Sequence, residues 1–169
     1  MGDVILKSIT LSSLEERYLE LSSSLVRTPT VKLTSPFLID LIKASQIYLK
    51  LECFQYSGTF KARGALSVAK QIPEKDKKFG ITAASAGNHA IAAAWAAKVE
   101  NLSAKVVRQT SANPFRISLA KTYGAEIIMK EGGVATFAEA DKLVREEKRT
   151  FIHPFDGVDT TLGAAGVGL

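Results

Sequence analysis

The chain has 169 residues, of which 46% are hydrophobic, and a formal net charge of +5 from 22 basic and 17 acidic side chains. This length fits one domain, or a small domain with part of another, and the apolar content is enough for a hydrophobic core. The densest basic group, at residues 75–78, is interrupted by Asp76. We interpret it as a solvated loop and expect no nucleic-acid binding.

Residues 1–7 lack a basic region followed by an apolar run of signal-peptide length. The Ala-rich stretch at 90–97 is too short to cross a bilayer. Cys53 is the only cysteine, so no disulfide can form within the chain, which is compatible with a reducing cytoplasm. We therefore predict a cytoplasmic protein without a membrane partner.

The first sixty residues predict a helix and a strand. Ser12 and Glu15 have the spacing of a capping box, and leucines at helical spacing follow as far as Leu25. This helix should end before Pro29, because the residue that precedes a proline disfavours helical backbone angles. Residues 46–52 alternate apolar and polar side chains, which indicates a strand.

Beyond residue 61, helices and strands are predicted to alternate. Apolar side chains at helical spacing mark a helix over 62–72. Short apolar runs predict four strands, at 80–84, 104–108, 126–129 and 150–153. The helices predicted between these strands cover 89–99, a segment capped by Asn113 and ended by Gly124, and a segment from a capping box of Thr136 and Glu139 to about Lys148. The pattern predicts an α/β fold with an open parallel four-stranded sheet and flanking helices.

The last nine residues, 161–169, have the sequence of a glycine-rich turn that enters a helix. No polar C-terminal cap closes this segment. We therefore interpret the chain as the N-terminal part of a longer protein.

Lys61 is the first candidate for chemistry. It follows Phe60 in the run Ser57-Gly58-Thr59-Phe60-Lys61-Ala62-Arg63-Gly64-Ala65 and should lie in the first turn of a helix. The helix dipole disfavours a positive charge there, and desolvation beside Phe60 would act in the same direction. A neutral lysine amine can attack an aldehyde. The alternative, a surface lysine that happens to begin a helix, stays open.

The run Ser85-Ala86-Gly87-Asn88-His89-Ala90 is the second candidate. It lies where a strand enters a helix, and open parallel sheets bind ligands at such points. Backbone N–H groups at the helix start can hold a carboxylate or a phosphate. Gly87 lets the backbone approach closely, and Asn88 can donate to a ring oxygen. An ordinary helix-capping turn is the alternative. An amine beside an anion-binding turn suits chemistry on an amino acid that is held as an imine.

His89 and His153 are the only histidines, and with a single cysteine they make no metal-binding set. We interpret both as packing or hydrogen-bonding residues and predict no metal site. Neither a Ser/His/Asp order nor a phosphate-binding loop that ends in Gly-Lys-Ser/Thr is present.

Together, the runs at 50–55 and 57–65 resemble the signature of the pyridoxal-phosphate-dependent threonine/serine dehydratases. These enzymes belong to the fold group that resembles the tryptophan synthase β subunit. The resemblance covers most of the chain and continues, in the order of the family, through Arg27-Thr28-Pro29, residues 85–90, Tyr123-Gly124-Ala125-Glu126 and residues 151–156.

The resemblance implies roles for the candidate residues. Lys61 would be the Schiff-base lysine and the base that removes the substrate α-proton, and Phe60 would flank the pyridine ring. Asn88 would hydrogen-bond the ring hydroxyl of pyridoxal 5'-phosphate. The substrate carboxylate would be held by Ser85, Ala86, Gly87, Asn88 and His89. The cofactor acts as an electron sink, and loss of the β-hydroxyl group gives an enamine that hydrolyses to a 2-oxo acid and ammonia.

Several positions depart from the usual pattern of the family. Ala86 stands where related serine racemases have a serine that donates a proton, which favours a dehydratase. Ile91-Ala92 replaces Gln-Gly, Arg108-Gln109 replaces Met-Pro, and residues 163–166 replace Gly-Gln-Gly-Thr, which indicates a divergent member. The glycine-rich loop that cradles the cofactor phosphate, and the residue that faces the pyridine nitrogen, would come later in the chain.

The resemblance implies three parts. Residues 1–60 would be an N-terminal segment of a large domain, 61–155 a small substrate-gripping α/β domain, and 156–169 a return segment toward the large domain. The parent enzyme would deaminate L-threonine or L-serine in amino-acid metabolism, such as isoleucine biosynthesis, and this chain alone would be inactive.

Alternatives are a truncated homologue that acts as a binding or interaction module, a serine racemase-like enzyme, and a β-replacement synthase. We expect a homo-oligomer, because half a domain leaves apolar area uncovered.

Overall fold

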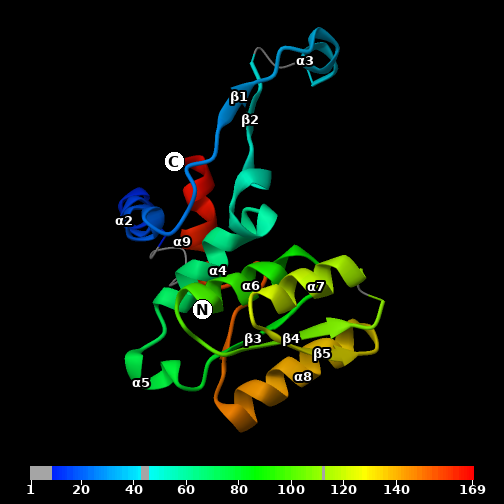
Figure 1. The fold of residues 1–169 in the computed structure, drawn as a ribbon. Helices are drawn as coiled ribbons and strands as arrows, with labels where there is room; N and C mark the ends of the chain where they lie inside the picture. The colour runs from blue at the N-terminus through cyan, green and yellow to red at the C-terminus, as the bar shows by residue number, and fades with distance from the viewer. Residues whose placement is uncertain (1–8, 43–45, 112) are drawn as a thin grey trace.

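The computed structural model describes residues 9–42, 46–111 and 113–169. Its centre is a four-stranded parallel sheet in the order β5-β4-β3-β6, which confirms the expected α/β fold (Figure 1). The bounds of the strands are Ile81–Ala84 for β3, Ala104–Gln109 for β4, Glu126–Lys130 for β5 and Thr150–Phe151 for β6. Each strand lies where an apolar run predicts one, and β6 is shorter than the predicted strand.

Helices cover both faces of the sheet (Figure 1). On one face lie α4 (Lys61–Lys70), α6 (Asn88–Val99) and α7 (Pro114–Thr122), and on the other lies α8 (Gly132–Glu147). Alternate strand residues point to opposite faces, so Val106 belongs to the core cluster of Trp95, whereas Val107 belongs to that of Leu143. Helix α6 is buried from His89 to Ala97, as its apolar sequence predicts.

Two helix ends form as predicted. The side chain of Asn113 caps α7 by accepting a 2.9 Å hydrogen bond from the N–H of Phe115. The chain turns after α7 at Gly124, whose φ of +87° favours glycine. The basic group at 75–78 differs from the predicted loop, because most of it lies in a short surface helix, α5 (Glu74–Lys77), in which Lys77 pairs with Glu74 at 2.8 Å.

The predicted capping box of Ser12 and Glu15 is wrong. Helix α2 (Leu11–Ser22) is capped by Thr10, two residues before Ser12; the backbone of Thr10 is extended and its side chain accepts a 3.2 Å hydrogen bond from the N–H of Ser13. The Ser13 hydroxyl accepts a 2.8 Å bond from the N–H of Thr10 in return. Ser12 lies inside the helix, where its N–H is one of the first-turn donors and cannot serve as the cap. The helix ends before Pro29, as predicted.

The predicted capping box of Thr136 and Glu139 is also wrong. Helix α8 begins at Gly132, where a φ of +73° turns the chain directly from β5 into the helix. Thr136 lies one turn inside and donates a 2.7 Å hydrogen bond to the carbonyl of Gly132. Glu139 instead pairs with Lys130 of β5 at 2.7 Å. The glycine turn makes a polar cap at Thr136 unnecessary.

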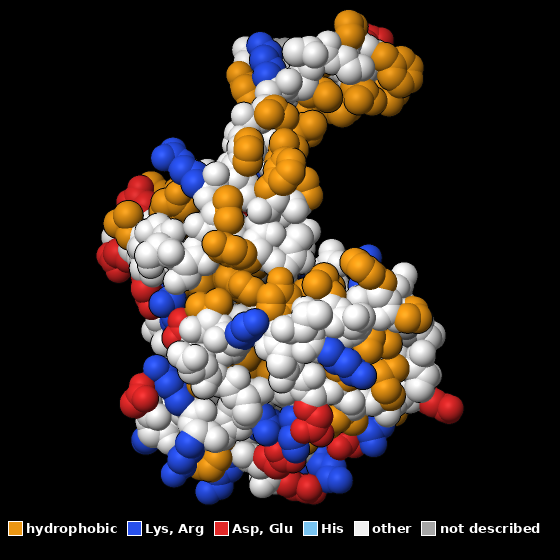
Figure 2. Space-filling model, in the orientation of Figure 1, with side chains coloured by type: hydrophobic (Ala, Val, Ile, Leu, Met, Phe, Trp, Pro, Cys, Tyr) orange, Lys and Arg blue, Asp and Glu red, His pale blue; other side chains and the backbone are white. Residues whose placement is uncertain are grey.

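A two-stranded antiparallel arm extends from the body of the molecule (Figure 1). It consists of β1 (Thr30–Lys32) and β2 (Tyr48–Lys50), with α3 (Pro36–Ile42) near its tip. The predicted strand at 46–52 is thus shorter in the structure, and β1 and α3 lie where no element is predicted. Hydrophobic side chains follow this arm (Figure 2), and Phe37 and Leu41 are among the exposed ones.

The last described helix, α9 (Val158–Ala165), packs against α2 and α4 and continues into the short helix η3 (Gly166–Gly168). The contact with α4 is close at Gly163, because an added β-carbon there would lie 2.5 Å from the carbonyl oxygen of Arg63. This position therefore requires glycine. The proposed domain boundaries after residues 60 and 155 stay a prediction.

Candidate functional site

Lys61 is the first residue of α4, as predicted. The short helix η2 (Tyr56–Gly58) precedes it, and within η2 Ser57 and Gly58 have φ angles of +63° and +67°. Two consecutive left-handed residues turn the chain sharply, and Thr59 and Phe60 then lead into α4. The small residues of the motif thus set the direction in which the lysine enters the helix.

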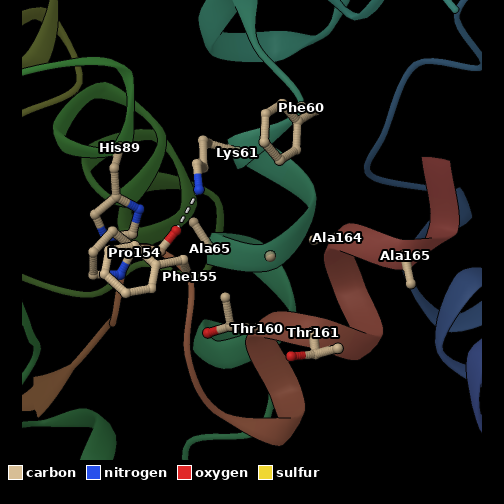
Figure 3. A pocket seen from close by; sticks show the side chains of 11 residues that line it. Phe60, Lys61, Ala65, His89, Pro154, Phe155, Thr160, Thr161, Ala164 and Ala165 are labelled. Atoms are coloured by element: carbon tan, nitrogen blue, oxygen red, sulfur yellow. Dashed lines mark hydrogen bonds between the residues drawn. The ribbon is translucent and has the colours of Figure 1, made fainter. Parts of the chain in front are cut away.

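The amine of Lys61 donates a hydrogen bond to the carbonyl oxygen of Pro154, and it lies 5.0 Å from the centroid of the Phe60 ring (Figure 3). Within the described part of the chain, no carboxylate forms an ion pair with this amine. Its partner is therefore a neutral backbone group. A ligand that displaces the Pro154 carbonyl can reach the amine without breaking a salt bridge.

The amine faces a cavity of about 350 Å³ between α4, α9 and the chain that follows β6 (Figure 3). Most of the surface that lines it is apolar. The lining residues are Phe60, Lys61, Gly64, Ala65, His89, Pro154, Phe155, Thr160, Thr161, Ala164 and Ala165. The lysine thus ends in a largely apolar pocket, which suits a flat aromatic ligand with a few polar groups.

His89 lines the same cavity and is 5% exposed. Its Nε2 lies 2.8 Å from the carbonyl oxygen of Ile152. Burial lowers the pKa of His89 to about 4, and the charges of Lys61 and His153 lower it further, against the effect of the Ile152 hydrogen bond. The imidazole is therefore neutral at pH 7, and its Nε2–H donates to Ile152. This agrees with the interpretation of His89 as a hydrogen-bonding residue.

Residues 85–88 form the turn between β3 and α6, at the carboxyl end of the sheet. The N–H of Ser85 donates to Val107 (3.1 Å), and the Ser85 hydroxyl accepts from the N–H of Gly87 (3.0 Å). Asn88 begins α6 and its side chain is exposed. The first N–H groups of an α-helix have no partner within the helix, so this turn has the chemistry of an anion site.

The structure brings only some of the predicted site residues together. Phe60, Lys61 and His89 line one cavity, whereas Ser85, Ala86, Gly87 and Asn88 do not belong to its lining among the described residues. His89 joins the two groups, because it follows the turn directly and faces the cavity. The turn and the cavity are thus neighbouring parts of one edge of the sheet.

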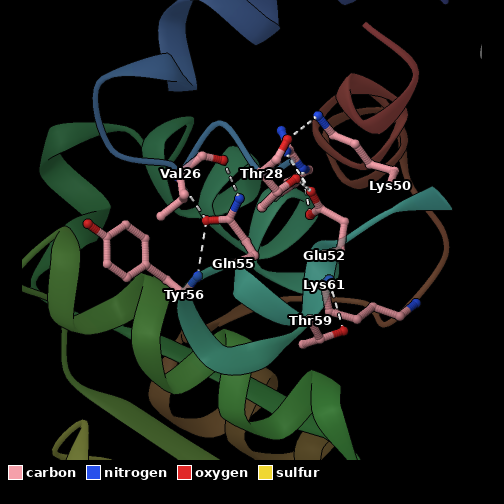
Figure 4. A network of polar contacts seen from close by, with 9 residues as sticks. Val26, Thr28, Lys50, Glu52, Gln55, Tyr56, Thr59 and Lys61 are labelled. Carbon is pink, nitrogen blue, oxygen red and sulfur yellow. Dashed lines mark hydrogen bonds and ion pairs between the residues drawn. The ribbon is translucent and has the colours of Figure 1, made fainter. Parts of the chain in front are cut away.

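A buried polar network holds the segment before Lys61 (Figure 4). The carboxylate of Glu52, in the short helix η1 (Glu52–Phe54), accepts two 2.8 Å bonds from Arg63 and a 2.5 Å bond from Thr28. Burial alone would raise the pKa of Glu52, but the hydrogen bonds from Arg63 and Thr28 bring it below its ordinary value. The pair therefore stays charged at neutral pH.

Gln55 extends this network to the segment after α2. Its side chain accepts from the N–H of Val26 at 3.0 Å and donates to the carbonyl of Val26 at 2.8 Å (Figure 4). Lys50 donates to the carbonyl of Thr28 at 2.9 Å. These bonds fix the entry to α4 from several directions. Thr28, Glu52 and Arg63 occur in the family-like motifs, but the motifs alone indicate no role for them.

Sequence reasoning also missed the residues that close the cavity from the C-terminal side, such as Pro154, Phe155 and Thr160. One signal could have found them: they follow β6, and the carboxyl ends of β3 and β6 lie at the same edge of a parallel sheet. In the described ranges, no group of three or more His, Cys, Asp or Glu side chains is placed to hold a metal ion. No described helix is both long and apolar enough to cross a membrane.

Residues 21–169 match the model of a family described as pyridoxal-phosphate dependent enzyme. Phenylserine dehydratase of Ralstonia pickettii is 42% identical over 127 residues, which are 75% of this chain and 39% of that protein. A catabolic L-threonine dehydratase of Staphylococcus aureus is 33% identical over 162 residues, which are 95% of this chain and 46% of that protein. These matches confirm the resemblance that the motifs carry.

Solved structures of similar fold include maize serine racemase, with a TM-score of 0.86, 28% identity, and coverage of 95% of this chain and 48% of that one. A bacterial threonine deaminase, from the source abbreviated T.th., gives a TM-score of 0.82 and 32% identity, over 95% of this chain and 50% of that one. This chain thus spans half the length of these relatives or less.

Proposed function

The chain belongs to the pyridoxal-phosphate-dependent enzyme family, and we propose that it carries the lysine and substrate loop of a dehydratase of β-hydroxy amino acids. The observation that supports this most is the position of Lys61. Its amine lies in an apolar cavity, beside an aromatic ring, and is held only by a neutral carbonyl. This is the environment that a lysine needs to exchange a proton for a covalent bond to an aldehyde.

The residues present fit the cofactor that the family uses. Lys61 would hold its aldehyde carbon, Phe60 would lie against its ring, and Asn88 at the start of α6 would hydrogen-bond its ring hydroxyl. When bound, pyridoxal phosphate supplies an electron sink for charge that develops at the substrate α-carbon.

The protein's own groups would then divide the work. The N–H groups at the start of α6 would hold the substrate carboxylate, and the Lys61 amine would accept the α-proton. His89 would contribute orientation and not acid catalysis, since its pKa of about 4 leaves it neutral at pH 7 and its Nε2 proton is bonded to Ile152. Ala86 has no hydroxyl with which to return a proton, which favours elimination over racemisation.

The proposed substrate class is the 2-amino-3-hydroxy acids, with L-threonine or L-serine as the first choice. The match to a phenylserine dehydratase is a reason to include L-phenylserine. The apolar lining of the cavity is compatible with a methyl or a phenyl group at the β-carbon. Comparing the three substrates therefore decides the preference that the sequence leaves open.

The test begins with cofactor capture by the purified protein. Added pyridoxal phosphate should give the visible absorbance band of a lysine-bound cofactor, and Lys61→Ala should abolish it. Lys70→Ala is the matched control, because Lys70 ends the same helix and pairs with Glu100. A band that survives Lys61→Ala would remove Lys61 from its proposed role.

The reaction itself is tested by release of a 2-oxo acid from L-threonine, L-serine and L-phenylserine. Release that depends on Lys61 supports the dehydratase. Cofactor capture without release from any of the three would support the alternative, a binding module without catalysis.

A further inference from the structure

Arg108 is a buried cation beneath the turn at 85–88. It lies on β4, two residues beyond Val106, and alternation along the strand places its side chain on the same face of the sheet as α6. Its side chain is 0% exposed. Its Nη2 donates a 2.6 Å hydrogen bond to the carbonyl oxygen of Ala86. The guanidinium is therefore directed at the turn that enters α6.

The other nitrogens of this guanidinium are not satisfied. Nε and Nη1 of Arg108 are buried and have no hydrogen-bond partner among the described residues. No carboxylate in the described ranges forms an ion pair with Arg108. A buried charge without a partner is costly, and proteins retain one chiefly where a ligand or a partner compensates it.

A second cation lies beside the same turn. A β-carbon added to Gly87 would lie 3.2 Å from a guanidinium nitrogen of Arg116, on α7. Burial, and then the charge of Arg116, lower the pKa of Arg108. Two guanidiniums thus flank Ala86 and Gly87, where the first N–H groups of α6 also add positive potential. The missing component of this arrangement is an anion.

We propose that Arg108 is a positioning residue for a ligand carboxylate bound at the turn 85–88: it orients the turn through Ala86 and supplies the charge that the carboxylate neutralises. This rests on the proposed function, in which the turn holds the substrate carboxylate. Arginine at this position departs from the methionine usual in the family, so the charge distinguishes this chain.

Two substitutions test the role. Arg108→Met removes the charge and keeps a long apolar side chain, whereas Arg108→Lys keeps a charge. Lys105→Met is the matched control, because it removes a cation from the same strand that instead pairs with Glu147 at 2.7 Å. Binding is followed by NMR, through the amide signals of residues 86–89, during titration with L-threonine and with L-threoninol, which lacks the carboxylate.

L-Threonine should shift these signals in the unmodified protein, and L-threoninol should bind more weakly. Arg108→Met should weaken L-threonine binding by about tenfold and leave L-threoninol binding unchanged. Arg108→Lys should recover part of the loss, and Lys105→Met should have no effect. The thermal midpoint should hold or rise in Arg108→Met, since an unpaired buried charge is removed.

An unchanged preference for L-threonine over L-threoninol in Arg108→Met would overturn the proposal. So would a lower thermal midpoint with equal losses for both ligands, which is the result expected for a residue of purely structural importance. These readouts need neither cofactor nor turnover, so the dehydratase proposal can fail while the carboxylate site stands.

Discussion

The guanidinium of Arg63 donates two hydrogen bonds of 2.8 Å to the carboxylate of Glu52, and the side chains of both residues are almost fully buried. Glu52 follows the arm strand β2 closely, and Arg63 lies two residues after Lys61. The pair therefore fixes the segment that delivers the lysine to the first turn of α4. Planar bidentate pairing of this kind holds orientation as well as charge.

Glu52→Ala should destabilise the protein by about 3–5 kcal/mol, because it leaves the Arg63 charge buried without a partner. Urea unfolding measures the loss. Glu126→Ala is the control, since Glu126 is largely exposed and lies 3.9 Å from Lys105, and it should cost about 1 kcal/mol or less. Equal losses in the two variants would show that the buried pair does not hold this segment.

His89 should make stability depend on pH. Its pKa is about 4 in the folded protein and 6.5 in the unfolded chain, so between these values the unfolded state binds more protons. The free energy of unfolding should therefore fall as the pH falls below about 6.5, by up to about 3 kcal/mol near pH 4. Above pH 6.5 this contribution is constant.

The measurement is urea unfolding between pH 7.5 and 4.5 for the protein and for His89→Gln. The glutamine amide can donate to Ile152 but does not titrate, and the carboxylates are common to both proteins. The unmodified protein should thus lose more stability than the variant as the pH falls. Parallel pH profiles would contradict the buried neutral imidazole.

Gly163 should be intolerant of a side chain. An added β-carbon would lie 2.4 Å from the Ser67 β-carbon and 2.5 Å from the Arg63 carbonyl oxygen, so Gly163→Ala must push α9 away from α4. We expect a loss of about 1–3 kcal/mol in urea unfolding. Gly133→Ala, whose β-carbon would meet only Gln109 at 3.5 Å, should be neutral or slightly stabilising, because alanine favours helix α8. Similar losses in both variants would exclude close packing as the cause.

The elements that were predicted well depend on local information. The strands β3, β4 and β5 and the helix α6 follow from apolar runs and periodicity within a few neighbouring residues. Where two cap spacings compete, as with Thr10 against Ser12 and Gly132 against Thr136, the pattern alone cannot choose. The winner is decided by backbone angles that depend on the preceding turn.

The site was predicted less completely, because its contacts join distant parts of the chain. The motif indicates that Lys61 begins a helix, but its amine bonds to Pro154, 93 residues away. Periodicity likewise placed Arg108 on a strand without indicating its burial or its contact with Ala86. Such pairings depend on how the strand ends meet in space.

Asn88 and Asn113 should separate ligand binding from helix stability. Asn88 begins α6 with an exposed side chain, whereas Asn113 caps α7 through the N–H of Phe115 at 2.9 Å. Asn113→Ala should cost about 1 kcal/mol of stability and leave pyridoxal phosphate affinity unchanged. Asn88→Ala should leave stability nearly unchanged and weaken cofactor affinity by about tenfold or more, because a hydrogen bond to a charged group contributes about 1.5–3 kcal/mol.

Absorbance titration with pyridoxal phosphate and urea unfolding of the same two variants give the comparison. The expected result is a crossed pattern, in which each variant affects one measurement and leaves the other unchanged. If Asn88→Ala lowers stability as much as Asn113→Ala does, and the two bind the cofactor equally well, Asn88 is a helix-start residue and has no place in the site.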